Sequence, residues 1–66
     1  MIVIVNGDRR DLPAGTTVEA VVSQVTQART GVAVALNDEV VRRSAWASTT
    51  VNDADRVEIL TAVQGG

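Results

Sequence analysis

The sequence predicts a small α+β domain in which one main helix packs on one face of a mixed β-sheet of four to five strands. Three observations support this fold class. The chain has 66 residues, which is enough for one domain only. Short β-branched runs are separated by turn-forming pairs, and one segment between two predicted hairpins has the apolar spacing of a helix. We expect the folded domain over residues 1–63 and a flexible C-terminal tail at residues 64–66.

The N-terminal residues are expected to form a hairpin. Residues 2–5 are all β-branched, which is typical of a strand. Both faces of this strand are apolar, which indicates an inner position in the sheet. Asn6 and Gly7 favour a two-residue turn, because both residue types tolerate positive φ. The returning strand, residues 9–12, is short and polar, and the Pro-Ala-Gly run after it ends the strand.

A helix is predicted over residues 17–28. Its apolar stripe falls at positions i, i+3, i+4 and i+7 and consists of Val18, Val21, Val22 and Val25. Thr16 and Glu19 have the spacing of a capping box, in which each side chain bonds the backbone N–H of the other residue. We expect residues 29–31 to end the helix, and the valine stripe to pack on the sheet against Val57 and Ile59.

A second hairpin is predicted after the helix. Its strands are residues 32–36 and 39–41, and the Asn-Asp pair between them favours a tight turn. Residues 42–48 are expected to form a connection that contains Trp46, the only aromatic residue, and a short extended piece is expected at residues 49–51.

The last predicted strand covers residues 56–63. The first and last strands carry the longest apolar runs, so we expect them to lie side by side in the middle of the sheet. Strand alternation places Leu60 and Ala62 on the face opposite Val57 and Ile59. Leu60 is apolar where a solvated face would be polar, so we expect an exposed apolar patch there that binds partner proteins. The alternative is that loops of the chain cover Leu60.

Composition excludes several functional classes. The chain has no cysteine and no histidine, so it has no disulfide, thiolate nucleophile, zinc finger or imidazole base. Its aspartates lie mainly at predicted turns, where their side chains bond the local backbone. We therefore expect a protein that is not an enzyme and that binds no cofactor or metal of its own. The net charge of −2 argues against nucleic acid and anionic membranes as partners.

The location and the basic residues are less informative. The first apolar stretch is too short to span a membrane, and the absence of cysteine fits a reducing compartment, so we expect a cytoplasmic protein. All six basic side chains are arginines. Codon bias explains this simply, although the absence of lysine would also protect an activated acyl group on the chain from side-chain amines. Arg42 and Arg43 lie near Trp46, either to contact an acidic partner or, as we favour, as a solvated pair beside an aromatic lid on the core.

The C-terminal residues Gln64, Gly65 and Gly66 are the most informative feature of the sequence. Two glycines after a final strand add no burial and have maximal backbone entropy, so they do not stabilise the fold. A backbone without side chains can enter a narrow channel and present its carboxylate to the chemistry of another protein. The alternative is a frayed terminus.

Several motifs are shared with a known family. They are Val5-Asn6-Gly7, the run from Leu12 to Val18, the run from Val32 to Asn37, Val40-Val41, Arg43-Ser44-Ala45-Trp46-Ala47 and the closing run from Asp55 to Gly66. On these residues the whole chain resembles the small sulfur-carrier proteins of thiamine (thiazole) biosynthesis, which have the ubiquitin-like β-grasp fold. The chain departs from the family pattern at Arg42, where proline is usual, and at Asp38 and Ala54, where glycine is frequent. These changes touch turns, so they bear on the turn types more than on function.

The resemblance implies a protein on which partner enzymes act. A ubiquitin-activating-like adenylyltransferase, using ATP and magnesium, would adenylate the Gly66 carboxylate. A sulfur donor, such as a cysteine desulfurase, would supply the sulfur of a thiocarboxylate on Gly66, which thiazole synthase would consume. Gln64 and Gly65 would enter the partner active sites together with Gly66. The open alternatives are a carrier for molybdopterin or another sulfur metabolite, and a ubiquitin-like modifier or binding module.

Overall fold

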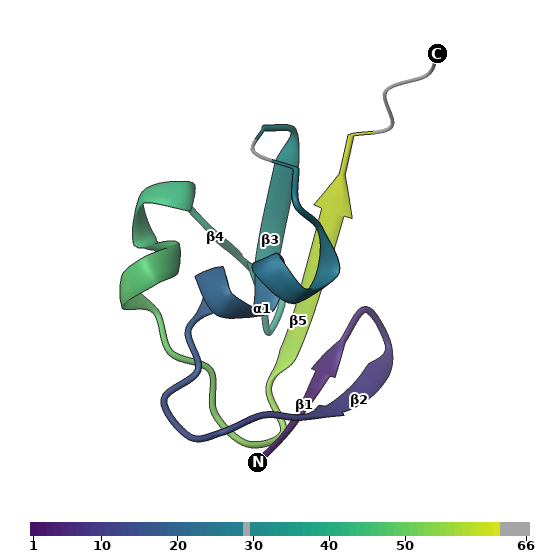
Figure 1. The fold of residues 1–66 in the computed structure, drawn as a ribbon, viewed down its shortest axis with the longest axis vertical. Coiled ribbons are helices and arrows are strands. Elements are labelled where there is room, and N and C mark those ends of the chain that lie inside the picture. Colours follow the sequence, from purple (N-terminus) through teal and green to yellow (C-terminus); the bar gives the residue numbers. More distant parts are fainter. Residues whose placement is uncertain (29, 63–66) are drawn as a thin grey trace.

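The computed structural model describes residues 1–28 and 30–62, which form one five-stranded sheet with one α-helix and one 3₁₀ helix. In chain order the elements are β1 (Ile2–Val5), β2 (Asp8–Asp11), α1 (Val18–Val25), β3 (Val32–Leu36), β4 (Glu39–Val41), the 3₁₀ helix η1 (Arg43–Ser48) and β5 (Arg56–Thr61). Figure 1 shows α1 lying across one face of the sheet with η1 beside it. The predicted α+β class, with one main helix on one face of a mixed sheet, is confirmed.

The first and last strands lie side by side, as predicted. The strand order is β2-β1-β5-β3-β4, which makes β5 the middle strand. β1 runs parallel to β5, with Ile4 opposite Arg56 and Val5 opposite Val57. On its other side β5 pairs antiparallel with β3 over five residue pairs. One hairpin therefore flanks β5 on each side.

The core lies between α1 and the sheet. The predicted valine stripe faces inwards: Val18, Val21 and Val22 are buried, and Val25 is half-buried against them. The sheet supplies alternate residues of its three inner strands, namely Val3, Val5, Val34, Val57 and Ile59. Burying a valine side chain contributes about 1.5 kcal/mol or more, which outweighs the modest helix propensity of valine.

The predicted capping box at the start of α1 is wrong. Thr17, not Thr16, is the N-cap residue, and its side chain accepts a hydrogen bond from the N–H of Ala20 at 3.2 Å. The Thr16 hydroxyl instead donates to the carbonyl of Pro13 at 2.7 Å, because Thr16 belongs to the turn before the helix. Glu19 lies in the first turn of α1, where its charge is favourable towards the helix dipole.

The helix is also shorter than predicted, because α1 ends at Val25 and not at residue 28. Thr26 has extended backbone angles, and its hydroxyl accepts a hydrogen bond from the N–H of Ala28 at 3.0 Å. A threonine side chain that bonds the local backbone competes with the helical pattern and stops it. Arg29, part of the predicted helix end, lies outside the described residues.

Residues 43–48 form a 3₁₀ helix within the segment that the sequence predicted only as a connection. Within it Trp46 is buried, and its indole N–H donates to the carbonyl of Val41 at 2.9 Å. The aromatic ring thus closes one side of the core, as expected for a lid. A buried tryptophan with a satisfied N–H fixes this segment even though its sequence has no strong helical pattern.

The strand bounds differ slightly from those predicted. β2 begins and ends one residue earlier than expected, and Leu12 leaves the strand to enter the core. β5 ends at Thr61, whereas Val63 and the predicted tail at residues 64–66 lie outside the described residues, so the domain boundary stays a prediction. The turn between β1 and β2 has positive φ at both Asn6 and Gly7, as predicted.

Candidate partner-binding site

The end of β5 carries the residues predicted to meet partner proteins. Leu60 is 71% exposed and Ala62 is also exposed, as expected from strand alternation. The alternative in which loops cover Leu60 is therefore wrong. Gln64, Gly65 and Gly66 lie outside the described residues. Their entry into partner active sites, and the binding role of Leu60 and Ala62, stay predictions.

The loop before β3 holds the end of β5 in place. The N–H of Ala62 donates to the carbonyl of Gly31 at 2.7 Å. A Cβ on Gly31 would lie 3.0 Å from the Cβ of Ala62, and Gly31 has φ of +70°. Both the close approach and the backbone angle favour glycine here. The sequence marked Gly31 only as part of the predicted helix end, so its contact with Ala62 was missed.

The sheet face away from α1 carries an apolar cluster, which we call the open-face patch. It consists of Ile4, Ala33, Ala35, Val40 and Leu60. Ala33, Val40 and Leu60 are exposed, and the other two residues are half-buried. The register places Leu60 opposite Ala33, and Val40 opposite Ala35. Because alanine is small, the larger side chains are left open to solvent, and Val40 is 80% exposed. An apolar surface of this kind is typical of protein-binding sites.

Charges of both signs border the open-face patch. The guanidinium of Arg56 donates to the carboxylate of Asp38 at 2.8 Å, and both side chains are exposed. The hydrogen bond and the negative charge of Asp38 raise the pKa of Arg56, and Glu58 adds a smaller effect in the same direction. Since neither sign dominates, the border suits another protein better than a polyanion.

Asn6 holds β5 from the β1 side. Its Oδ1 accepts from the N–H of Ile59 at 2.7 Å, and its Nδ2 donates to the carbonyl of Ile59 at 3.1 Å. The side-chain amide therefore replaces a peptide group of β1, whose chain turns away at Gly7. The sequence assigned Asn6 only a turn role. The available signal was an asparagine at a turn position where glycine would also fit.

Arg42, Arg43 and Trp46 do not join the open-face patch. η1 contacts α1 on the helix side of the sheet, and Trp46 is 6% exposed. The guanidinium carbon of Arg43 lies 5.3 Å from the centroid of the Trp46 ring, within the range of a cation–π contact. The two arginines are exposed, which agrees with the favoured interpretation of a solvated pair beside an aromatic lid.

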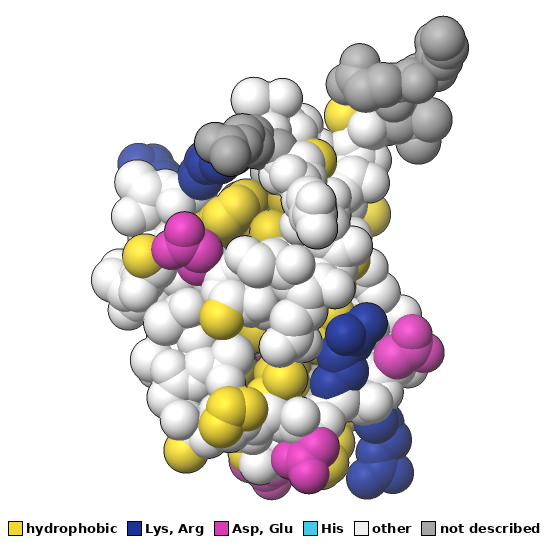
Figure 2. Space-filling view, viewed as in Figure 1, with side chains coloured by type: hydrophobic (Ala, Val, Ile, Leu, Met, Phe, Trp, Pro, Cys, Tyr) yellow, Lys and Arg dark blue, Asp and Glu magenta, His cyan; other side chains and the backbone are white. Residues whose placement is uncertain are grey.

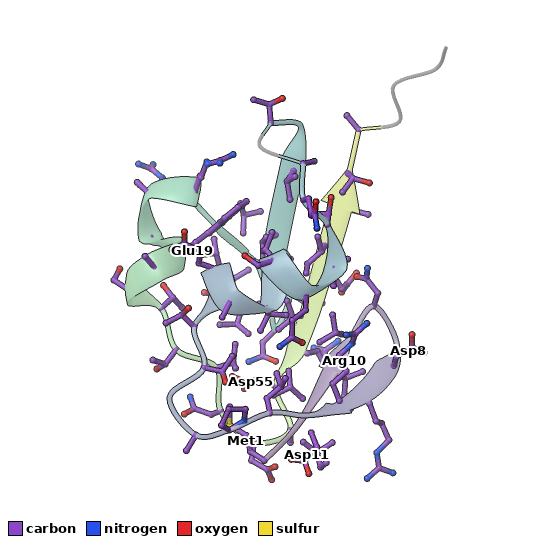
Figure 3. The ribbon with its side chains drawn as sticks, in the orientation of Figure 1. Met1, Asp8, Arg10, Asp11, Glu19 and Asp55 are labelled. Carbon is purple, nitrogen blue, oxygen red and sulfur yellow. The ribbon has the colours of Figure 1, made fainter. Side chains whose placement is uncertain are left out.

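The acidic side chains are dispersed. Figure 3 shows Asp8, Asp11, Glu19 and Asp55 in separate places, on β2, α1 and the loop before β5. Within residues 1–28 and 30–62, no three acidic side chains are grouped closely enough to hold a metal ion. Figure 2 shows the helix side of the molecule, where the basic side chains lie in separate groups. No helix in the described part of the chain is long and apolar enough to cross a membrane.

Two relatives in sequence cover the whole chain. A thiazole synthase of Paramagnetospirillum magneticum is 38% identical over all 66 residues, which span only 20% of that longer protein. The sulfur carrier protein ThiS of Escherichia coli is 32% identical over 66 residues, and both chains are covered completely.

Solved structures with more than a third of residues identical have the same fold. The crystal structure of the thiamine biosynthesis protein ThiS from Geobacter metallireducens has a TM-score of 0.75, 37% identity and full coverage of both chains. The solution structure of a thiamine biosynthesis protein from the same organism has a TM-score of 0.79 and 36% identity, covering all of this chain and 88% of the other. These matches confirm the ubiquitin-like β-grasp fold that the resemblance implied. The ThiS family model matches residues 3–66, and the chain therefore belongs to the ThiS family.

Proposed function

We propose that this chain is a sulfur carrier protein of thiamine biosynthesis and that Gly66 carries the sulfur as a thiocarboxylate. The observation that carries the proposal is the match, over the full length of both chains, to the sulfur carrier protein ThiS of Escherichia coli. The Geobacter ThiS structure supports it, because it too matches over the full length of both chains and has a similar fold. The chain itself acts as a substrate of partner enzymes.

The chemistry needs an activated carboxylate. A carboxylate is a poor acyl donor until one oxygen becomes part of a leaving group. Transfer of AMP from ATP to Gly66 would release pyrophosphate and leave an acyl adenylate, and hydrosulfide would then displace AMP, so that the acyl carbon exchanges its bond to the AMP oxygen for a bond to sulfur and becomes a thiocarboxylate. A ubiquitin-activating-like adenylyltransferase would bind the ATP and magnesium, and a separate donor would provide the sulfur. The carrier therefore needs no cysteine or histidine of its own, and it has neither.

The position of the α-amine supports such a role. An acyl adenylate reacts readily with amines, and the chain has no lysine. The N-terminal ammonium of Met1 donates to the carbonyl of Leu12 at 3.0 Å and lies 3.4 Å from the carboxylate of Asp11. Figure 1 shows that β1 begins at the end of the molecule opposite to the end of β5. The α-amine and the described end of β5 therefore lie at opposite ends of the domain (Figure 1).

The open-face patch is the surface we assign to partner docking. It continues along β5 to Leu60, two residues before the last described residue, so a protein bound there would lie next to the C-terminal end of the domain. Thiazole synthase is one such partner. The Paramagnetospirillum thiazole synthase supports this pairing, because that longer protein contains a stretch similar to the whole of this chain.

The test is sulfur loading at Gly66. The purified chain is incubated with ATP, magnesium, the adenylyltransferase and a sulfur source, and intact-protein mass spectrometry detects the replacement of one oxygen by sulfur. Deleting Gly66, or adding one alanine after it, should abolish loading. An added residue displaces the reacting carbon by about 3.5 Å, and misplacement of about 1 Å can already cost on the order of a hundredfold in rate.

Two controls make the result specific. Both variants should retain the folded state and nearly all of their affinity for the adenylyltransferase, because the change alters none of the residues that form the core or the open-face patch. Thiazole formation from the loaded chain and thiazole synthase separates this pathway from other sulfur-carrier pathways. An alanine-extended variant that gains sulfur as fast as the parent would show that Gly66 is not the carrying residue.

A further inference from the structure

We propose that the free edge of β5 at Thr61 receives an extended segment of thiazole synthase as an added β-strand. This inference rests on the proposed function, because it names how that partner holds the chain. It concerns the backbone of β5, whereas the docking role of the open-face patch concerns side chains.

The direction of each backbone group along β5 can be deduced from the observed hydrogen bonds. The N–H of Ala62 points to β3, since it donates to Gly31, and the carbonyl of Arg56 accepts from Asn37 on the same side. Backbone groups alternate in direction along a strand. The backbone N–H and carbonyl groups of the even-numbered residues of β5 therefore point to β3, and those of Thr61 point to the β1 side.

On the β1 side the ladder stops before it reaches Thr61. β1 pairs with β5 up to Val5 opposite Val57, and the N–H of Asn6 then donates to the carbonyl of Val57 at 2.9 Å. The Asn6 side chain occupies both backbone groups of Ile59. Beyond it, no strand of the described part of the chain lies beside Thr61, so its two backbone groups form an open edge.

A groove lies next to this edge on the open face of the sheet. It has a volume of about 430 Å³, and its walls include Ile4, Asn6, Gly7, Glu58 and Leu60. A strand added beside Thr61 would lie in line with β1, beyond the turn at Gly7, and would pair with the same edge of β5. Every second side chain of that strand would lie on the open-face side, next to Leu60 and the groove. An apolar side chain fits this position best, because Ile4 and Leu60 provide apolar walls.

Two observations favour thiazole synthase as the source of the added strand. The edge adjoins the open-face patch at Leu60. A protein docked on the patch could therefore pair with Thr61 within the same contact area. A thiazole synthase that contains a stretch 38% identical to this whole chain indicates that carrier and synthase work side by side. Pairing at Thr61 would also fix the direction in which the C-terminal residues leave the sheet.

The edge can be tested with one substitution and a matched control. Thr61→Pro removes the N–H that would pair with the partner, and within the chain this N–H is not used in the β3 ladder. Thr61→Val keeps the N–H and changes only the side chain. We expect Thr61→Pro to bind thiazole synthase about tenfold more weakly, as for the loss of one backbone hydrogen bond. Thr61→Val should stay within about twofold of the parent. Equal affinities of the two variants would overturn the proposal.

Amide hydrogen exchange of the unsubstituted chain gives an answer even if Thr61→Pro does not fold. The Thr61 amide should exchange at least about tenfold more slowly in the complex with thiazole synthase, whereas the Leu60 amide, already paired with β3, should change little. Unchanged exchange at Thr61 would overturn the proposal. Protection that appears only with the adenylyltransferase, or only with a second copy of the chain at high concentration, would overturn the choice of partner.

The outcome is separable from the proposed function. Both measurements use the unloaded chain, and sulfur loading of the parent is measured independently by mass. A parent that gains sulfur while Thr61 stays unprotected in the synthase complex retains the carrier function and loses the added strand. A parent that never gains sulfur loses the carrier function, whatever the exchange at Thr61.

Discussion

Replacing Asn6 with glycine should weaken the fold more than a change at an exposed turn residue normally does. The substitution removes the two hydrogen bonds to Ile59, at 2.7 and 3.1 Å, and leaves the backbone conformation of the turn accessible. Both hydrogen bonds are partly buried, so water would replace them only in part. At about 1 kcal/mol for each hydrogen bond, the free energy of unfolding should fall by about 2 kcal/mol. A chain of this length has a total of roughly 3–10 kcal/mol.

Urea unfolding monitored by Trp46 fluorescence measures this loss. Trp46 is the only aromatic residue and is buried, so its emission reports directly on the core. With a slope of about 1 kcal/mol per molar urea, the midpoint should fall by about 2 M. Asn6→Ala should cost about 1 kcal/mol more, because φ at this position is +49° and alanine disfavours positive values. An Asn6→Gly midpoint within about 0.5 M of the parent would refute the role of the side-chain amide in holding β5.

Two further predictions concern the open-face patch and the core. Leu60→Glu should weaken binding to the adenylyltransferase and to thiazole synthase by about tenfold or more without lowering the melting temperature, since Leu60 is 71% exposed. Isothermal titration calorimetry measures this against Gln24→Glu, which makes the same charge change on α1, and equal affinities of the two variants would exclude the patch as the docking surface. Val22→Asp should unfold the chain, because it buries an unpaired charge in so small a core. Circular dichroism of both variants should show Val22→Asp unfolded and the control Ser23→Asp, on the exposed side of the same helix, folded; a folded Val22→Asp would contradict the packing of α1.

Most of the fold could be predicted because its signals are local. β-branched runs mark β1 and β5, and an Asn-Gly pair marks the first turn. The valine stripe of α1 is visible as a spacing, and burial of one face confirms it. Element bounds were less accurate. Two adjacent threonines, Thr16 and Thr17, both suit an N-cap, and only the contacts of the preceding turn decide between them.

Two features could not be predicted, for a different reason: the 3₁₀ helix, and the pair of hydrogen bonds between the Asn6 side chain and the backbone of Ile59, which we call the Asn6 clamp. η1 depends on the burial of Trp46 against α1, which is a contact between distant parts of the chain. The clamp depends on where β1 ends relative to β5, because the Asn6 amide bonds Ile59 only where the β1 backbone has turned away. Neither fact is encoded in a local pattern.

The open-face patch was predicted only in part. Strand alternation within β5 is a local property, so the exposure of Leu60 could be predicted from the sequence alone. Val40 joins the patch because β4 pairs with β3 in a register that places it over Ala35. The two-residue turn at Asn37 and Asp38 sets that register locally, whereas the pairing of β3 with β5, which brings Val40 to the same face as Leu60, joins distant parts of the chain. Gly66, the residue most important for the proposed chemistry, lies outside the described residues, so its role rests on the sequence and on the family.

The place of β5 in the sheet would suit a protein whose C-terminal residues enter other proteins, as we propose for this chain. A force on those residues acts first on β5. An edge strand is held from one side and can be peeled away one pair at a time, whereas β5 is paired with β3 over five residue pairs and with β1 on the other side. Where β1 is too short, the Asn6 amide continues its bonding to Ile59. The strand is thus fixed on both sides up to Ile59 and on one side to Ala62, so a force on its C-terminal end would meet backbone hydrogen bonds to β3 and to the β1 side.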